Sequence, residues 1–308
     1  MSERFDFHTH TCVSDGSLTP TELVRRAQEN RVTGFALTDH DTVDGVAEAR
    51  AEGERLGIEV LAGIELSVNE ADGARAMHVL GLGLDADHAP LRARLVELRA
   101  SRVGRGERIV AHLQANGIGI SVDAVARHAA GGAVGRPHVA RALVELGAVR
   151  DVDEAFTRWL RRGRPAYEPN AELSARDAIE LVHAAGGVAV LAHPPLSGGV
   201  DSPGGLVAFV ERLVPLGLDG LEVWHPSHKA TVMRRLRRIA TAHGLIETGG
   251  SDFHGADRPD VEVGRGRGGK LHIGRDVRDA LERKWLERRA ERGLTLTQAG
   301  SNLGRPYE

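Results

Sequence analysis

The sequence predicts an α/β protein built on short buried strands with a helical insertion. Three observations lead to this fold class. Short apolar runs recur along most of the chain, and helical patterns separate them. The 308 residues are 41% hydrophobic and 27% charged, which is an ordinary globular composition. One long segment lacks strand signal altogether. Strands that alternate with helices imply a parallel sheet, either open or closed into a barrel.

The beginning of the chain alternates strand and helix. Residues 19–30 are predicted to form a helix with Pro20 in its first turn. A second helix is predicted at 46–56, and strands are predicted at 5–7, 34–37, 58–67 and 77–84. The same alternation returns late in the chain, with helices at 175–185 and 277–292 and strands at 188–191, 220–223 and 245–249.

The segment between these two parts carries helix signal only. We interpret residues 90–167 as a helical insertion that covers the active site. The barrel would then consist of residues 1–89 and 168–293, followed by a tail at 294–308.

Composition excludes several classes of protein. No apolar run is long enough for a transmembrane helix, and the charged start of the chain leaves no room for a signal peptide, so a cytoplasmic location is predicted. The single cysteine, Cys12, excludes an internal disulfide and a multi-cysteine zinc site. A net charge of −3 indicates no long nucleic-acid track, although local arginine clusters are compatible with an anion site. No feature indicates a membrane or an obligate protein partner.

Potential metal ligands follow the predicted strands. The runs are FDFHTH, ALTDHDT, AGIELS, AMHVLGL, AVLAHP and TGGSDFHG. In a parallel barrel the carboxyl ends of the strands meet on one face, where such folds place their active sites. The candidate ligands are His8, His10, Asp15, His40, Glu65, His78, His193, Asp252 and His254.

Each candidate has an ordinary structural alternative. His8 and His10 point to the same side of an extended strand, as do Asp252 and His254, but a surface strand with two histidines is equally compatible with the first pair. Asp15 lies in an Asp-Gly dipeptide, which is common in turns, so its role could be structural. Glu65 could be a solvated glutamate at the barrel rim. His78 and His193 could be hydrogen-bonded core histidines inside strands. Asp39 and Asp41 are candidates for orienting His40. The set as a whole favours metal binding. Mixed imidazole and carboxylate ligands suit manganese, iron or zinc, and nine groups suit two or three ions.

The combined motifs resemble those of the PHP (polymerase and histidinol phosphatase) family. They are HTH at 8–10, SDG at 14–16, TDHD at 38–41, GIE at 63–65, His78, AHP at 192–194 and GSDFH at 250–254. The resemblance covers nearly the whole chain and implies a distorted (β/α)7 barrel with a trinuclear metal site. Three features resemble the subgroup of 3′,5′-nucleoside bisphosphate phosphatases (RNase AM). They are SDGSLTPTELV, the helical insertion, and GRPHVARALVELGAV followed by RRGRPAYEP. GRGRGGKLHIG and the tail depart from that pattern.

The resemblance also implies which side chains hold each ion. His8, His10, Glu65 and Asp252 would bind the first ion. Glu65 would bridge to a second, held also by His78 and His193. The third would be bound by Asp15, His40 and His254. Manganese is the expected metal, with iron and zinc as alternatives.

Candidate substrate-binding residues lie mostly in the insertion. Arg102 and Arg105 share one face of a predicted helix, and Arg136 and His138 lie in GRPHVAR. Guanidinium groups bind phosphate bidentately, so an insertion folded over the barrel mouth could supply them. Ser227 and His228 match the subgroup too. The alternatives are a solvated face for the arginines, and a helix cap beside a surface histidine for the last pair. GRGRGGK lacks the spacing of a phosphate-binding loop and is predicted to be a basic turn.

The activity implied is hydrolysis of a phosphomonoester by a metal-activated hydroxide. His193, His254 and Asp41 are the candidates for protonating the leaving group. The subgroup implies a 3′,5′-nucleoside bisphosphate such as pAp as substrate, with short 5′-phosphorylated RNA as a related one. Three alternatives stay open: a phosphatase for AMP or histidinol phosphate, an amidohydrolase, although no candidate bridging lysine is present, and a non-catalytic metal-stabilised binding module.

Overall fold

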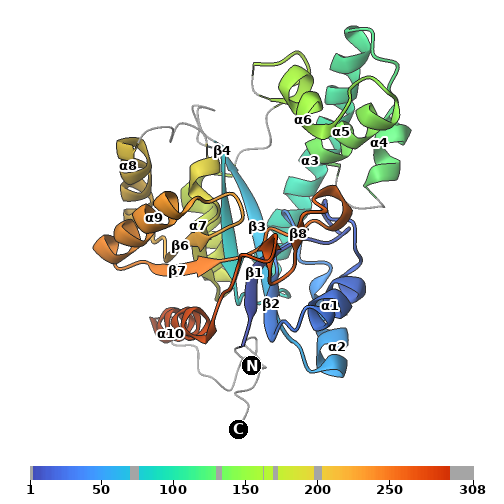
Figure 1. Cartoon of the computed structure of the whole chain (residues 1–308). Coiled ribbons are helices and arrows are strands. Elements are labelled where there is room, and N and C mark those ends of the chain that lie inside the picture. The colour runs from blue at the N-terminus through green and yellow to red at the C-terminus, as the bar shows by residue number, and fades with distance from the viewer. Residues whose placement is uncertain are drawn as a thin grey trace.

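A seven-stranded sheet forms the centre of the protein, and its strands follow each other in chain order. The structure is a computed structural model that describes residues 3–69, 76–129, 134–161, 163–168, 173–197 and 203–291. The strands are β1 (Phe5–Thr9), β2 (Gly34–Leu37), β3 (Glu59–Asn69), β4 (Ala76–Leu82), β5 (Val188–Leu191), β6 (Gly220–Trp224) and β7 (Ile246–Gly249). A bridge between Thr9 and Phe253 joins β1 to the segment after β7, so the sheet curls back toward its first strand (Figure 1). The predicted distorted barrel is confirmed.

One strand runs against the predicted direction. β4 is antiparallel to both β3 and β5, so the expectation of an all-parallel sheet is wrong here. The physical reason is the connection: β3 ends at Asn69 and β4 starts at Ala76, and so short a link joins antiparallel strands, whereas parallel neighbours need a longer crossover. The start of β4 therefore lies at the same rim as the ends of the parallel strands. His78, opposite Ser67, reaches that rim from the amino-terminal end of its strand.

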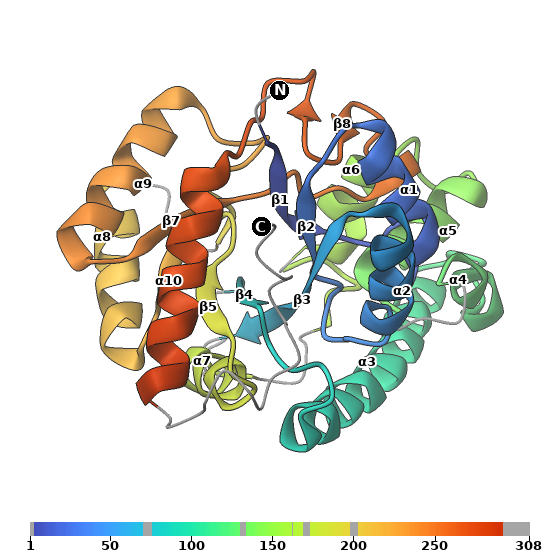
Figure 2. The ribbon, with the colours of Figure 1, turned by 90° about the horizontal axis from the view of Figure 1, so that it is seen from below.

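Six helices surround the sheet. They are α1 (Pro20–Glu29), α2 (Val46–Leu56), α7 (Ala175–Ala184), α8 (Pro203–Leu213), α9 (Ala230–His243) and α10 (Arg275–Glu291). Thr19 caps α1, and Glu22 completes its capping box. Seen from below, α1, α2, α7, α8 and α9 lie outside the strands while α10 crosses the end opposite the rim (Figure 2). There Trp285 donates a hydrogen bond to the carbonyl of Gly83 at 2.8 Å, which fixes α10 across that end.

The insertion has a hydrophobic core of its own. Its elements are α3 (Ala89–Ala115), α4 (Val122–His128), α5 (Arg136–Glu145), α6 (Val152–Ala155) and a π-helical turn, η1 (Phe156–Leu160). Leu91, at the start of α3, packs into the main core, whereas Leu113 near its end packs with α4 and α5 in a separate cluster. Figure 1 shows these helices above the strand ends. The domain boundaries at 90 and 167 stay a prediction, because Leu91, Leu95 and Leu98 of α3 belong to the main core and the separate cluster begins at Ile109.

Short elements complete the fold. Among the described residues, 3₁₀ turns and a two-stranded ribbon connect the larger elements. The turns are η2 (Pro194–Leu196), η3 (Val214–Leu216) and η4 (Gly255–Asp257), and the ribbon consists of β8 (Val261–Glu262) and β9 (Gly266–Arg267). The basic GRGRGGK stretch, predicted as a turn, forms turns on both sides of β9. Gly264 and Gly266 have φ of 70° and 58°, which favours glycine there. The predicted tail at 294–308 lies outside the described residues. Among the helices that the structure describes, none has the length and apolarity to cross a bilayer.

Candidate metal centre

All nine predicted ligands converge at the rim of the barrel. Their donor atoms form four overlapping groups, each with all its atoms within 4.8 Å of one another. The groups are His10, Asp15, His40 and His254; His8, His10 and Asp252; His8, Glu65 and His193; and His40, Glu65 and His78. The implied third set lies within the first group, which adds His10, and the implied first set recurs without Glu65. His78 and His193 fall into separate groups that share Glu65.

The Glu65 carboxylate lies between several imidazoles. Its Oε1 is 2.8 Å from Nδ1 of His78 and 2.9 Å from Nε2 of His193. Its Oε2 is 3.1 Å from Nε2 of His8 and of His10, and 3.3 Å from Nδ1 of His40. Glu65 lies within β3 rather than at its end, and the two oxygens face different imidazoles. This is the arrangement that a bridging carboxylate requires.

The donor set fits a cation. Nε2 of His8 lies 3.1 Å from Nε2 of His10 and 3.6 Å from Oδ1 of Asp252, and His10 lies 3.4 Å from that same oxygen. Two atoms that each lie about 2.1 Å from one ion are about 3.0–3.4 Å apart at octahedral to tetrahedral angles. Nε2 of His8, Nε2 of His10, Oδ1 of Asp252 and Oε2 of Glu65 all face one point. Protons on the two imidazoles cannot satisfy all of the lone pairs that meet there. A divalent ion would satisfy all four.

Without an ion, the charges of the cluster are strongly coupled. Burial lowers the pKa of His10, but hydrogen bonds to Asp252 and Glu65 outweigh this and raise it to about 10. Burial raises the pKa of Glu65, but the surrounding imidazoles, His40 and His8 foremost, bring it well below its usual value. His40 differs, because burial dominates and lowers its pKa to about 3. The Glu65 carboxyl is therefore ionised among the imidazoles, and a cation bound by the same groups would take the place of the imidazole protons.

Backbone strain gathers at the same rim. Of the four described non-glycine residues with positive φ, three lie here: Asp41 at 50°, His193 at 27° and Asp252 at 52°. The backbone N–H of each donates a hydrogen bond. That of Asp41 donates to the Glu65 carbonyl at 3.0 Å, that of His193 to the Glu222 carboxylate at 2.7 Å, and that of Asp252 to the His8 carbonyl at 2.9 Å. Such conformations are costly for side-chain-bearing residues and persist where the surrounding contacts enforce them.

Two buried groups of the centre were missed by the sequence analysis. Glu222, on β6, accepts a hydrogen bond from Nδ1 of His8 at 2.9 Å. His225, directly after β6, lies 3.2 Å from Oδ2 of Asp252 through its Nε2. The signal was present, since LEVWHP also places a charged residue and a histidine on and just after an apolar strand. β6 is the one strand of the sheet that the six runs of candidate ligands do not include.

The two aspartates beside His40 have other contacts. Asp39 accepts hydrogen bonds from the backbone and hydroxyl of Thr11, at 2.7 and 2.6 Å, and from the hydroxyl of Ser14 at 2.6 Å, so it holds the loop that carries Asp15. Asp41 accepts from the Ser67 N–H at 2.8 Å and lines a small separate hollow beside α3. Because Asp41 does not line the cleft at the metal centre, the structure gives no support to its role as leaving-group acid.

A cleft of about 340 Å³ opens beside the cluster. The barrel lines one side and the insertion the other, with Arg105, Arg136, His138 and Phe156 among the insertion residues. The Arg136 guanidinium lies 5.9 Å from the centre of the Phe156 ring and 6.0 Å from that of Tyr167. The Nε of Arg105 donates to the Glu168 carbonyl at 2.8 Å, and Nδ1 of His138 accepts from the Gly135 N–H at 2.9 Å. The cleft thus joins ligand-type side chains to cationic ones.

Three predicted substrate residues lie elsewhere or outside the described side chains. The hydroxyl of Ser227 is 2.7 Å from Nδ1 of His225, and Nδ1 of His228 donates to the Val223 carbonyl at 2.9 Å. Neither residue lines the cleft. Both contact His225 instead, and the ring centre of His228 lies 5.1 Å from that of His225. The side chain of Arg102 lies outside the described part of the chain. Arg258 was not predicted, yet it lines the cleft and contacts Oδ2 of Asp252.

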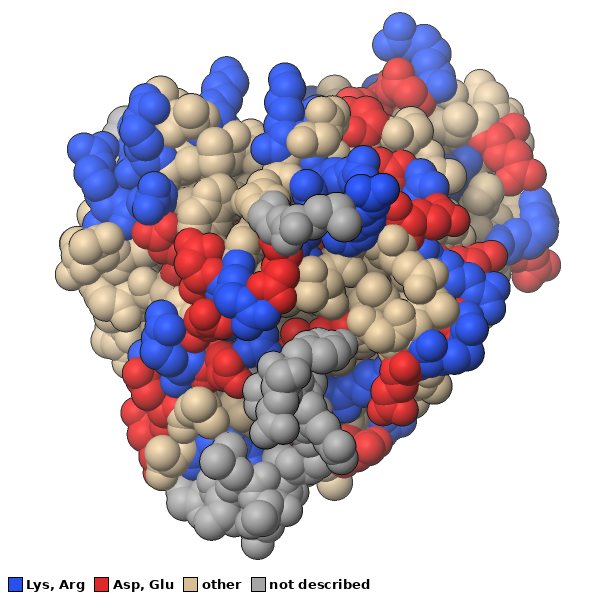
Figure 3. Space-filling view, turned by 60° about the horizontal axis from the view of Figure 1, so that its bottom comes forward, with Lys and Arg blue, Asp and Glu red and all other residues tan. Residues whose placement is uncertain are grey.

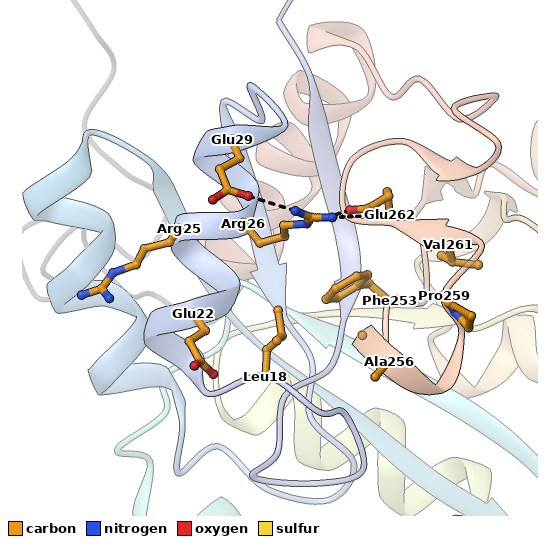
Figure 4. A pocket seen from close by; sticks show the side chains of 11 residues that line it. Leu18, Glu22, Arg25, Arg26, Glu29, Phe253, Ala256, Pro259, Val261 and Glu262 are labelled. Carbon is orange, nitrogen blue, oxygen red and sulfur yellow. Dashed lines mark hydrogen bonds and ion pairs between the residues drawn. The ribbon is translucent and has the colours of Figure 1, made fainter.

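The loop that carries Asp252 and His254 is braced from outside. Phe253, between them, faces a second hollow of about 510 Å³ against Leu18 and helix α1 (Figure 4). Arg26 spans this hollow, with its Nε 2.9 Å from Glu262 and its Nη1 3.0 Å from Glu29. None of the predicted ligands lines it. The loop itself is held by the His10 N–H, which donates to the Phe253 carbonyl at 2.9 Å, and by the Ser17 N–H, which donates to the His254 carbonyl at 3.0 Å.

Comparison with known proteins places this centre in a family. Residues 6–117 match the model of the PHP domain. The chain is 38% identical over 264 residues to a 3′,5′-nucleoside bisphosphate phosphatase of Chromobacterium violaceum, covering 84% of this chain and 90% of the relative. It is 36% identical to the 5′-3′ exoribonuclease Rnm of Escherichia coli, covering 85% and 88%. A solved structure from Bifidobacterium adolescentis, classed as a metal-dependent phosphoesterase, superposes with a TM-score of 0.80 at 30% identity, covering 97% and 99%.

The fold and the site define a metal-dependent phosphoesterase, a hydrolase that acts on phosphoric ester bonds. The chain belongs to the PHP family. Within that family it resembles the relatives that act on nucleotides or RNA, as the motifs predict.

Proposed function

We propose that this enzyme removes the 3′-phosphate of 3′,5′-nucleoside bisphosphates such as pAp, with short 5′-phosphorylated RNA as a second substrate. One observation carries the proposal: ligand-type side chains and the arginines of the insertion line the same cleft. A substrate with two phosphate groups matches such a site, because one group can lie at the metal centre while the other meets a guanidinium. The names of the two curated relatives support the same substrates.

Different groups of side chains would bind different ions. His8, His10, Glu65 and Asp252 would hold one ion, with Glu65 shared toward His78 and His193, and Asp15, His40 and His254 would hold another. Two or three ions, with manganese first and iron or zinc as alternatives, suit the four overlapping groups. When bound, such ions neutralise phosphate oxygens and lower the pKa of a water molecule.

The remaining residues bind and orient the substrate. Arg105 and Arg136 would bind the phosphate group that is not cleaved. The rings of Phe156 and Tyr167, beside Arg136, limit how far its guanidinium can move. His193 and His254, which line the cleft, are the two candidates for donating a proton to the leaving oxygen.

The test is phosphate release by manganese-loaded protein from pAp, beside AMP, histidinol phosphate and a short 5′-phosphorylated RNA. We expect pAp to be turned over fastest, and His8→Ala and Asp252→Ala to abolish turnover while the protein stays folded. Preference for another ester would reject the substrate and keep the phosphoesterase. Metal-loaded protein that releases phosphate from none of the four would favour a binding module.

A further inference from the structure

Helix α9 carries an unusual concentration of positive charge. Its sequence, ATVMRRLRRIATAH, contains four arginines and no acidic residue, and Lys229 precedes it. Leu236, Ile239 and Ala240 are buried and turn the helix against the sheet, so the arginines lie on the outer side. Lys and Arg side chains gather at the left edge of the face in Figure 3, the side on which α9 lies in Figures 1 and 2.

Within the part of the chain that the structure describes, three of these arginines have no carboxylate to neutralise them. The Nε of Arg237 pairs with Glu247 at 2.9 Å, and its guanidinium lies 6.0 Å from the centre of the Trp224 ring. For Arg234, Arg235 and Arg238, no acidic side chain in the described ranges lies within ion-pair distance. Arg234 and Arg238 are four residues apart on one helix face, where like charges destabilise a helix. An anionic ligand would remove that repulsion.

The arginines also shape a hollow. An open groove of about 760 Å³ runs along α9, lined by all four arginines together with Thr231, Thr241, Ala242 and Glu247. Guanidinium groups and hydroxyls are the side-chain donors that bind phosphate oxygens. None of the exposed large hydrophobic residues that the structure describes lies on this helix, which disfavours insertion into a lipid surface.

The amino-terminal end of α9 connects to the metal centre through one short loop. α9 follows the loop that carries His225, and Nε2 of His225 lies 3.2 Å from Oδ2 of Asp252. With a rise of about 1.5 Å per residue, Arg234 and Arg238 lie about 6 and 12 Å along the axis from the first residue of the helix. An RNA strand that left the cleft across this loop would reach the amino-terminal end of α9 first and then the arginines.

We propose that α9 is a docking surface for the phosphates of a single-stranded RNA whose 5′ end occupies the metal cleft. The inference rests on the proposed function, because it takes the cleft to bind a phosphorylated 5′ end. It adds to that function a reason why RNA would be bound more tightly than a mononucleotide. The surface is a short patch of Arg234, Arg235 and Arg238, not a long track.

The test compares two double charge reversals in the full-length, manganese-loaded protein. Arg234→Glu/Arg238→Glu removes two charges from the patch. Lys270→Glu/Arg283→Glu is the matched control, because both residues are exposed, lie outside the patch and have no ion pair among the described residues. Binding of a fluorescent twelve-nucleotide single-stranded RNA with a phosphorothioate backbone is measured by anisotropy over a salt series, and pAp turnover is measured in parallel.

We expect the α9 variant to bind this RNA at least about tenfold more weakly. The slope of log affinity against log salt should become shallower by about 1.4, since each phosphate contact on a single strand contributes about 0.7. The control variant should bind like the wild type, and pAp turnover should be unchanged in both.

Equal RNA binding by the two variants would overturn the proposal. So would polyglutamate that competes as strongly as unlabelled RNA, because this would indicate an acidic peptide as the ligand. Failure of the proposed function looks different. In that case pAp is not hydrolysed, while RNA binding still depends on Arg234 and Arg238.

Discussion

Nδ1 of His8 lies 2.9 Å from Oε1 of Glu222, and both side chains are completely buried. The contact determines which nitrogen of His8 is available, because Nδ1–H donates to the carboxylate and Nε2 is left facing His10, Glu65 and Asp252. The other oxygen of Glu222 accepts the N–H of His193, whose φ is 27°. One carboxylate on β6 thus positions two candidate ligands from β1 and the loop after β5.

Replacing Glu222 by glutamine should therefore weaken metal binding. A glutamine offers only one oxygen, so it cannot accept hydrogen bonds from both His8 and the His193 N–H. Losses of about 10–100-fold in metal affinity are typical when such partners of ligands are removed. Competition with a chromophoric chelator for Mn²⁺ or Zn²⁺ measures this directly.

Asp219→Asn provides the matched control for Glu222→Gln. Asp219 is a buried carboxylate directly before β6, but it contacts His183 and Arg288, away from the cluster. We expect it to cost stability and to leave metal affinity unchanged. Equal metal affinity in Glu222→Gln and the wild type would contradict the positioning role.

Replacing Glu65 by glutamine should remove more metal than replacing His78 by alanine. Glu65 belongs to two of the four groups of donor atoms and contacts five imidazoles, whereas His78 belongs to one group. Elemental analysis of purified protein should show more than one ion lost per chain in Glu65→Gln and at most one in His78→Ala. Equal losses would indicate that Glu65 does not bridge.

The sequence predicts the fold and the ligand set because both depend on local patterns. Strand and helix boundaries follow from the period of the apolar residues, and β2 and α2 match their predicted ranges of 34–37 and 46–56. Most of the nine candidate ligands follow an apolar run directly, whereas Glu65 lies inside β3 and His78 near the start of β4. What the sequence misses is long-range geometry. The reversed direction of β4 depends on a connection length, and the contacts of Glu222, His225 and Arg258 bring together segments far apart in the chain.

Arg136→Ala should raise KM for pAp by about tenfold with a smaller effect on kcat, because a guanidinium that binds the uncleaved phosphate acts in the ground state and the transition state alike. Arg136 is the first residue of α5 and lines the cleft beside Phe156. Arg127→Ala is the control, since Arg127 lies in the same insertion, is exposed and pairs with Glu145 at 3.9 Å. Steady-state kinetics of both variants measure KM and kcat for pAp separately. A fall in kcat alone for Arg136→Ala would place this side chain at the reacting phosphate instead.

The stability of the barrel should depend on pH through Asp219. Burial raises the pKa of this carboxyl, but hydrogen bonds to His183, Arg288 and the Ala189 N–H outweigh it and bring the pKa below its usual value. A carboxyl whose pKa is lowered on folding stabilises the protein above its unfolded value, which is about 3.9, and that contribution is lost as the pH falls through the folded pKa. Asp219→Asn should therefore lower the free energy of unfolding by about 2–4 kcal/mol at neutral pH.

The difference between Asp219→Asn and the wild type should shrink as the pH falls below about 4, because protonation removes the same charge from the wild-type protein. Urea unfolding across this range measures it. Asp87→Asn serves as the control, since Asp87 is 96% exposed and its ion pair with Arg92, at 3.8 Å, should contribute little. A pH-independent difference would mean that the hydrogen bonds of Asp219, and not its charge, carry the stabilisation.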